Sequence, residues 1–202
     1  AGRVRKLICV SNFTKSEIGT ILGRRDVAVV HNTIPKTLSM EVRSSSGLLE
    51  IIGDDDFILA VGTLEPRKNL HRLVKAFEKA SLENVKLVII GTSGAAFRQM
   101  ETPWSMSDMI ILGGYVSDSE LSALYTSARC FIYPSIYEGF GIPPLEAMSF
   151  DCPVLVSSTS SMPEVCGEAS IYFDPFNVEF ISRAIVKMMS CSETEKNVFL
   201  GS

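Results

Sequence analysis

The feature that most constrains this chain is the alternation of short apolar runs with segments of helical periodicity. Apolar runs that lack a polar partner at every second residue are buried on both faces, and such strands form parallel sheets. The pattern therefore predicts a doubly wound α/β fold, with right-handed crossovers and helices on both faces of the sheet. The predicted strands are 7–12, 27–32, 57–63, 86–91, 109–114, 130–135, 153–158 and 170–174.

Helix boundaries are marked by capping signals. Thr14 with Glu17 forms one predicted capping box, and Gly23 is placed to end that helix; Ser117 with Glu120 forms a second box. Two further helices are predicted from apolar stripes at helical spacing. These stripes are Leu70, Leu73, Val74, Phe77 and Ala80, and then Ile181, Ile185 and Met188.

The alternation is interrupted between the second and third predicted strands. This stretch contains Pro35, a run of three serines at 44–46 and three consecutive aspartates at 54–56. We interpret residues 33–55 as a linker. It separates a strand–helix–strand piece, residues 1–32, from a larger α/β unit, residues 56–202. The chain starts without Met and its tail has no helix stop signal, so we expect a piece of a longer protein.

Composition excludes several classes of protein. Hydrophobic residues make up 46% and charged residues 21% of the 202 residues, which is typical of a globular chain. The net charge of −4 gives no overall attraction to nucleic acid. The five cysteines include no Cys-x-x-Cys pair and there are only two histidines, which favours a reducing compartment and argues against a metal centre. No apolar run approaches the ~18 residues of a membrane-spanning helix.

Ligands of doubly wound sheets bind beyond the carboxyl ends of the strands. Arg67 and Lys68 follow the strand at 57–63 and precede a helix N-terminus, where the helix dipole already places partial positive charge. Two cations in this position suit an anionic ligand such as phosphate. The competing interpretation is a solvated basic turn.

A second candidate region follows the strand at 130–135. Gly139 and Gly141 allow the backbone to approach a ligand closely, and prolines at 143 and 144 suit the first turn of a helix. Glu146 is then expected in that first turn, where its carboxylate can accept two vicinal hydroxyl protons, as in a ribose. Glu138 can hydrogen-bond sugar hydroxyls or balance developing positive charge. The alternative is a tight turn followed by an ordinary glutamate.

Two other segments have simpler interpretations. Residues 91–94, Gly-Thr-Ser-Gly, resemble a shortened phosphate loop but lack the full glycine pattern, so a structural turn is favoured. The aspartates at 54–56 precede a strand, so we place them at the opposite end of the sheet from any ligand and interpret them as a solvated loop. A flavodoxin-like domain would need an acidic pocket or flavin loop at the strand ends, where this chain has a basic pair.

Together these residues resemble the retaining glycosyltransferases of family 4, whose GT-B architecture consists of two facing Rossmann-like domains. The matching stretches are 8–14, 61–70, 112–118, 133–135 with 137–148, and 160–165 with Gly167. The resemblance implies a Rossmann-like parallel sheet that forms the C-terminal half of a GT-B fold. Residues 56–202 would be the donor nucleotide-sugar domain, and residues 1–32 the end of the N-terminal acceptor domain.

The resemblance also implies roles for individual residues. Arg67, Lys68 and Glu138 are the expected catalytic set, with the cations on the leaving diphosphate and the glutamate on the donor sugar. Glu146 is expected on the ribose, and the backbone at 114–116 near the base. The expected donor-binding residues are Gly114, Tyr115, Val116, Gly139, Phe140, Gly141, Ile142, Leu145 and Glu146.

By the same resemblance, the implied reaction is transfer of a hexosyl group with retention, without a metal or another cofactor. The donor is a nucleoside-diphosphate sugar, and the acceptor is a saccharide or a lipid-linked saccharide. The Glu-Pro-Arg-Lys-Asn segment is similar to that of O-antigen mannosyltransferases, which suggests GDP-mannose, with UDP-sugars as the alternative. Family members act in the cytoplasm, often at the membrane face. A non-catalytic nucleotide-sugar-binding module is the alternative, and we expect the piece alone to be inactive.

Overall fold

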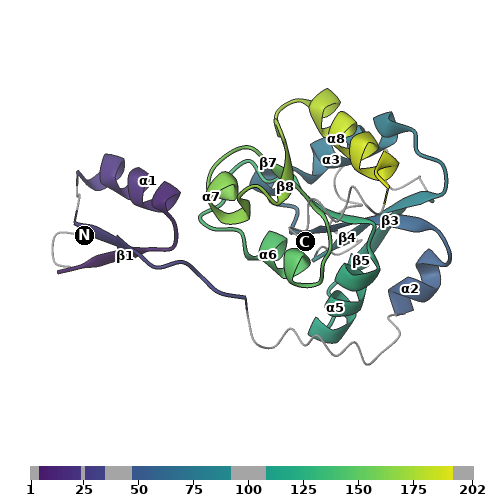
Figure 1. Ribbon diagram of the computed structural model, residues 1–202, viewed down its shortest axis with the longest axis horizontal. Helices are drawn as coiled ribbons and strands as arrows, with labels where there is room; N and C mark the ends of the chain where they lie inside the picture. The colour runs from purple at the N-terminus through teal and green to yellow at the C-terminus, as the bar shows by residue number, and fades with distance from the viewer. Residues whose placement is uncertain (1–4, 24–25, 35–46, 92–107, 193–202) are drawn as a thin grey trace.

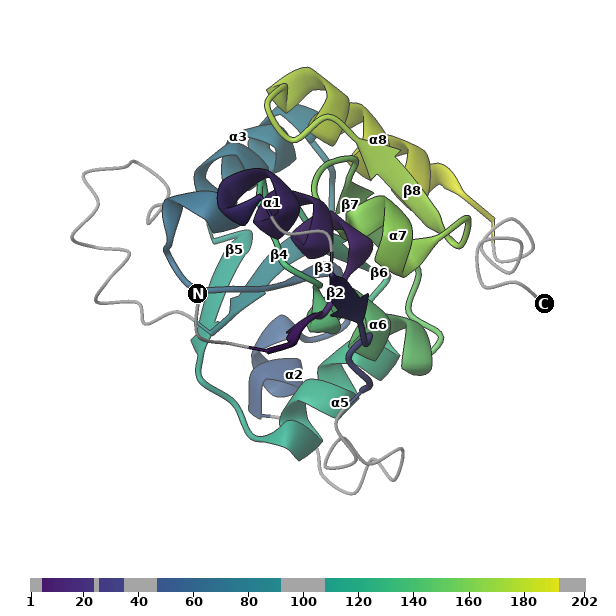
Figure 2. The same cartoon turned by 90° about the vertical axis from the view of Figure 1, so that its left-hand side faces the viewer.

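The computed structural model describes residues 5–23, 26–34, 47–91 and 108–192. The N-terminal unit is small: strands β1 (Leu7–Cys9) and β2 (Val27–Val29) pair in parallel and are joined by helix α1 (Asn12–Leu22). The larger unit contains a six-stranded sheet (Figure 1). Figure 2 views the molecule from the side of the N-terminal unit, with α1 in front of the larger unit.

The larger unit alternates strands and helices along the chain. Its strands are β3 (Asp56–Val61), β4 (Val85–Ile90), β5 (Ile110–Gly114), β6 (Cys130–Tyr133), β7 (Val154–Ser157) and β8 (Ser170–Phe173). Its helices are α2 (Gly47–Ile52), η1 (Pro66–Lys68), α3 (Leu70–Ala80), α5 (Asp118–Ser127), α6 (Ile142–Ser149), α7 (Met162–Cys166) and α8 (Val178–Ser190). Each predicted strand is confirmed, within three residues at either end.

The strand order in the sheet is β5-β4-β3-β6-β7-β8, and every neighbouring pair is parallel. The chain therefore builds one half of the sheet outward from β3 and the other half outward from β6. The direction of winding reverses between these two central strands, which is the arrangement of a Rossmann-like doubly wound fold. The predicted fold class is confirmed.

The central strands are buried on both faces because they are apolar at nearly every position. In β3, Ile58 and Ala60 face a core that includes residues of α3 and α8, whereas Phe57 and Leu59 face a core that includes residues of α2, α5 and α6. The predicted stripes explain the first of these cores. Leu73, Val74, Ile181, Ile185 and Met188 are all completely buried.

Helix capping agrees with the sequence at two places and differs at one. Ser117 and Glu120 form the predicted capping box, and Gly23 ends α1 in the left-handed conformation. The capping box predicted at Thr14 is wrong. The hydroxyl of Ser11 accepts the Thr14 N–H at 3.0 Å, so α1 begins three residues earlier than predicted. Ser and Thr are comparable N-caps, and sequence alone did not discriminate between them.

The predicted linker, residues 33–55, contains a short helix. Ile52 of α2 is buried against the larger unit, and the Lys86 ammonium donates to its carbonyl at 2.6 Å. Residues 35–46 of this linker lie outside the described residues, and the division of the chain into domains stays a prediction. Asp55 pairs with Lys86 at 2.8 Å near the N-terminal ends of β3 and β4. The acidic run therefore lies at the end of the sheet where we expected it.

The turn before α6 depends on a glycine. Gly141 has φ of 101°, and a Cβ atom added to it would lie 2.3 Å from Cε of Met162. Met162 is itself completely buried at the start of α7. An alanine at position 141 would meet both an unfavourable backbone conformation and a side chain that has little room to move.

We expect Gly141→Ala to lower the free energy of unfolding by about 2–4 kcal/mol, since backbone strain of about 1–2 kcal/mol adds to an overpacking penalty. Gly53→Ala is the matched control. Gly53 also has a positive φ, 69°, but has no atom within 4 Å of the added Cβ. Urea unfolding of both variants separates backbone strain from overpacking. Equal losses in the free energy of unfolding would contradict the contribution from overpacking against Met162.

Candidate functional site

Among the described residues, a cluster of polar side chains lies where the winding of the sheet reverses, between β3 and β6. Helix η1 follows β3, and the loop that carries Glu138 follows β6. Because β3 and β6 are parallel neighbours, the segments after them emerge side by side at the same edge of the sheet. Crevices at such switch points are the usual ligand sites of doubly wound folds.

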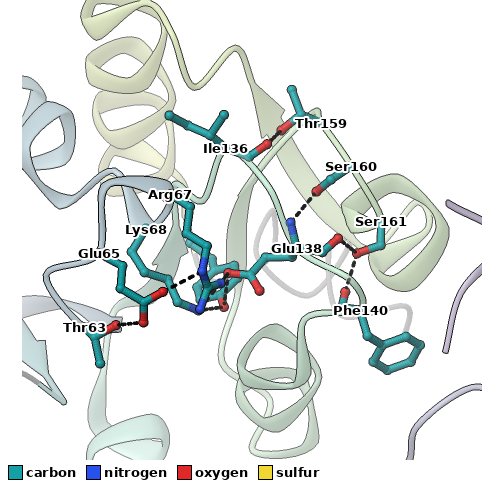
Figure 3. A network of polar contacts seen from close by, with 11 residues as sticks. Thr63, Glu65, Arg67, Lys68, Ile136, Glu138, Phe140, Thr159, Ser160 and Ser161 are labelled. Carbon is teal, nitrogen blue, oxygen red and sulfur yellow. Dashed lines mark hydrogen bonds and ion pairs between the residues drawn. The ribbon is translucent and has the colours of Figure 1, made fainter. Parts of the chain in front are cut away.

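One carboxylate oxygen organises this cluster (Figure 3). Oε1 of Glu138 accepts hydrogen bonds from Lys68 Nζ at 2.7 Å, Arg67 Nη1 at 2.9 Å and the Tyr133 hydroxyl at 3.0 Å. Lys68 also donates to the Tyr133 hydroxyl at 2.6 Å. The structure thus brings the three predicted catalytic residues together. Arg67 and Lys68 lie 71 and 70 positions before Glu138 in the chain, and both contact the same oxygen atom of its carboxylate.

The backbone of the β3 turn is tied to the β6 loop. Asn69, in the left-handed conformation and completely buried, donates through its amide group to the carbonyls of Pro134 and Pro175 at 3.1 and 2.7 Å. The amide of Ile136 donates to the carbonyl of Arg67 at 2.8 Å. These bonds hold the two cations beside the loop independently of their side-chain ion pairs.

The backbone of Glu138 is held from the other side by the segment before α7. Its N–H donates to the Ser160 hydroxyl at 3.1 Å. The Ser161 hydroxyl lies 2.9 Å from the carbonyl of Glu138 and 2.7 Å from that of Phe140. Ser161 is completely buried, so these two carbonyls share its single hydroxyl proton in place of water. The glutamate therefore projects from a firmly held peptide (Figure 3).

The cluster as a whole is formally neutral, which the sequence did not predict. Glu65 accepts from Arg67 Nε at 2.8 Å and from the Thr63 hydroxyl at 2.7 Å. The hydrogen bond from Thr63, with the one from Arg67, lowers the pKa of Glu65. Two carboxylates thus balance the two cations. An incoming anion would have to share Arg67 and Lys68 with Glu65 and Glu138 rather than meet an uncompensated basic pair.

Tyr133 belongs to this cluster although it was not among the predicted site residues. It is the last residue of β6 and is 1% exposed. Burial, together with the adjacent Glu138 charge, raises the pKa of its phenol well above the usual value. Tyr133 is therefore a neutral donor to Glu138. The sequence signals were its place in the family-matching stretch 133–135 and a hydroxyl-bearing residue near the end of an otherwise apolar strand.

Glu146 lies differently from its predicted place. Helix α6 begins at Ile142 with prolines next, so Glu146 is its fifth residue and belongs to the second turn rather than the first. Its carboxylate accepts from the Tyr125 hydroxyl at 3.1 Å. Burial raises its pKa, with a smaller contribution from the charge of Asp118. The dipole argument for this residue was wrong, while its ribose role stays a prediction.

The remaining predicted residues lie around the same sheet edge. Gly114 ends β5 and its carbonyl accepts from the Gly91 amide at 2.7 Å. Tyr115, next in the chain, is 82% exposed, and Val116 is partly buried. Gly139 and Phe140 belong to the Glu138 loop, whereas Gly141 caps α6 and Ile142 and Leu145 belong to it. Most of the segment 91–94 lies outside the described residues.

Two further kinds of feature are absent from the described residues. No group of three or more His, Cys, Asp or Glu side chains in those parts of the chain could hold a metal ion. Within the same residues, no helix is both long and apolar enough to cross a membrane.

The fold and the site together define a Rossmann-like α/β protein with a polar cluster at its switch point. A model of the family described as "Glycosyl transferases group 1" matches residues 46–198. The chain belongs to this family, which confirms the resemblance noted in the sequence.

Individual relatives agree with this assignment. The chain is 33% identical to O-antigen chain mannosyltransferase B of Escherichia coli, over 91% of this chain and 51% of that protein. It is 34% identical to O-antigen chain mannosyltransferase RfbU of Salmonella typhimurium, over 72% and 44%. A sucrose-phosphate synthase structure from Thermosynechococcus elongatus has a TM-score of 0.80 at 20% identity, over 99% and 52%. The chain thus spans about half the length of these relatives.

We expect Lys68→Met to lower the free energy of unfolding by about 2 kcal/mol, because Glu138 remains buried with one charged partner fewer. Adding Glu138→Gln to that variant should recover part of the loss. Lys79→Met is the control, since its pair with Glu179 is 53% and 41% exposed, and should change stability by less than about 1 kcal/mol. Equal effects at positions 68 and 79 in urea unfolding would contradict the structural role of the cluster.

Proposed function

We propose that this chain is the donor-binding part of an enzyme that transfers a hexosyl group, with mannosyl favoured, from a nucleoside-diphosphate sugar to a saccharide or lipid-linked acceptor. One observation carries the proposal: Arg67 and Lys68 after β3 meet Glu138 after β6 at the switch point of a group 1 glycosyl transferase fold. Cations at the carboxyl ends of the strands suit the diphosphate of such a donor.

The chemistry follows from where charge develops. The bond between the anomeric carbon and the β-phosphate oxygen breaks, its electron pair goes to the phosphate, and the sugar gains positive character. Cations held in advance beside that oxygen stabilise this transition state more than the ground state. Arg67 and Lys68 have this role. Glu138, which holds both of them through one oxygen, lies beside them for the sugar.

The start of α6 supplies fewer amide donors than an ordinary helix. Prolines at positions 143 and 144 carry no N–H, so two of the amides that helix N-termini offer to anions are missing. In the proposed complex the diphosphate therefore depends on the two side-chain cations more than on the backbone of Gly141 to Leu145. Retention and independence from metal are parts of the same proposal.

Mannosyl is favoured because the Escherichia coli and Salmonella typhimurium relatives are called O-antigen chain mannosyltransferases. This supports GDP-mannose as donor and a growing saccharide as acceptor, with the reaction in the cytoplasm. We test the reaction as mannose transfer from GDP-mannose by the full-length protein. Binding of GDP-mannose without transfer would instead support a binding module.

We expect Arg67→Ala to lower kcat for this transfer by about 10²–10³-fold, the usual effect of removing one preorganised donor from a developing oxyanion. The Arg67 side chain is 41% exposed and Glu138 keeps its bond to Lys68, so truncation should destabilise the fold less than Lys68→Met, and urea unfolding measures the difference. Arg183→Ala is the control, because Arg183 is 70% exposed and pairs only within its own helix in the described structure. Undiminished turnover of Arg67→Ala would remove its role.

The raised pKa of Glu146 gives a second prediction. If its carboxylate accepts the ribose hydroxyls, GDP binds the ionised form, so affinity is full above this pKa and falls as pH drops through it. Since burial raises the pKa, the fall should begin at a higher pH than for an ordinary glutamate. Glu146→Gln should bind GDP more weakly at pH 7.5 and lose this pH dependence.

Inorganic pyrophosphate is the control ligand for the titrations, because it has no ribose and reports only the phosphates and their cations. Calorimetric titrations at several pH values should show the same pyrophosphate affinity for the wild type and Glu146→Gln. If GDP affinity is also the same in both proteins, the ribose assignment is wrong.

A further inference from the structure

The N-terminal unit contacts the loop that carries Glu138. The hydroxyls of Ser11 and Thr14, at the start of α1, donate to the carbonyl of Gly139 at 2.6 and 2.9 Å. The two hydroxyls are 2.8 Å apart, and Ser11 is completely buried. Two donors from a separate sheet unit thus converge on one carbonyl oxygen, in the residue directly after Glu138.

A carboxylate fixes the position of α1 for this contact. Oε1 of Glu164, on α7, accepts from the Asn12 N–H and side-chain amide, both at 2.8 Å. Oε2 accepts the Phe13 N–H at 3.1 Å, and His31 Nε2 lies 2.9 Å from Oε1. The bonds from these backbone amides lower the pKa of Glu164 although burial opposes the shift. Free amides at a helix N-terminus are strong partners for a carboxylate.

These contacts join three segments to one another: the Glu138 loop, the segment 160–164 and helix α1. The segment 160–164 holds the backbone of Glu138 through Ser160 and Ser161, and holds α1 through Glu164. Helix α1 in turn holds Gly139. Phe13 of α1 also packs edge to face against Tyr137 of this loop, with 5.3 Å between the ring centroids.

Without these contacts, Gly139 would be the residue at which the backbone of this loop rotates most freely. Glycine has the largest backbone freedom of any residue, so the peptides on either side of it can rotate readily. The Ser161 hydroxyl fixes the carbonyl before Gly139, and the Ser11 and Thr14 hydroxyls fix the carbonyl after it. Both peptide planes next to the glycine are then held, which limits movement of the loop that carries Glu138.

We propose that Ser11 and Thr14 are positioning residues, through which the N-terminal unit aligns Glu138 for the transfer step. The kinetic part of this inference rests on the proposed function, because it assigns Glu138 to the donor sugar. The unit that would carry the acceptor side thereby sets the geometry of a group on the donor side. Contacts within the larger unit hold the Glu138 peptide and carboxylate, and contact with the N-terminal unit adds the restraint on the next peptide, at Gly139.

The test is Thr14→Val in the full-length protein, which keeps the shape of the side chain and removes its donor. We expect kcat for mannose transfer to fall about 10–100-fold, as for other small misplacements of catalytic groups, with KM for the donor changed less than about twofold. Thr14→Ser should restore kcat. Thr20→Val is the matched control, because the Thr20 hydroxyl bonds only to Ser16 within α1 in the described residues.

Hydrogen exchange of the ligand-free protein tests the contact separately from the reaction. The amides of residues 138–141 should exchange faster in Thr14→Val than in the wild type, and Thr20→Val should match the wild type. Unchanged exchange, unchanged kcat, or an equal loss in Thr20→Val would overturn the inference. A wild type that transfers no mannose would count against the proposed function, and the exchange result alone would then decide whether the hydroxyls hold the loop.

Discussion

The parallel pairing of β3 with β6 is the constraint on which the rest of the molecule depends. Ile58 and Leu59 pair in register with Cys130 and Phe131, although the chain visits two other strands between them. This pairing brings the two loops at the switch point together. The cations of one loop and the carboxylate of the other can then share a partly buried space, where their interaction is stronger than in water. Core packing on both faces supports the pairing and the pairing creates the site.

The balance of charge in the cluster keeps the two cations in place. An isolated pair of cations at this edge would repel each other, whereas Glu138 and Glu65 compensate them and keep their side chains in place. A ligand that enters replaces existing hydrogen bonds of these side chains. Because the side chains are already ordered, binding does not have to pay for ordering them. The neutral Tyr133 phenol helps because it donates to Glu138 and accepts from Lys68 at once.

The sequence predicted the strands, the doubly wound fold and the meeting of Arg67, Lys68 and Glu138, because these follow from buried apolar runs and from the residues after strand ends. It placed the start of α1 three residues too late, since Ser11 and Thr14 are similar caps. It missed Tyr133 and Glu65, whose roles depend on distances across the fold rather than on spacing. The predicted position of Glu146 in the first turn was wrong because α6 begins at Ile142, before the two prolines, which puts Glu146 fifth in the helix.

The contact between the two units combines side-chain pairs, such as His31 with Glu164, with bonds that run from side chains to main chain. Ser11 and Thr14 reach a carbonyl, while Glu164 reaches the amides of α1. Main-chain atoms are the same whatever residue occupies the position, so the bonds from Ser11, Thr14 and Glu164 constrain the opposite sequence less than side-chain pairs do. This contact should therefore tolerate substitution on the side that supplies main-chain atoms better than on the side that supplies the hydroxyls and the carboxylate.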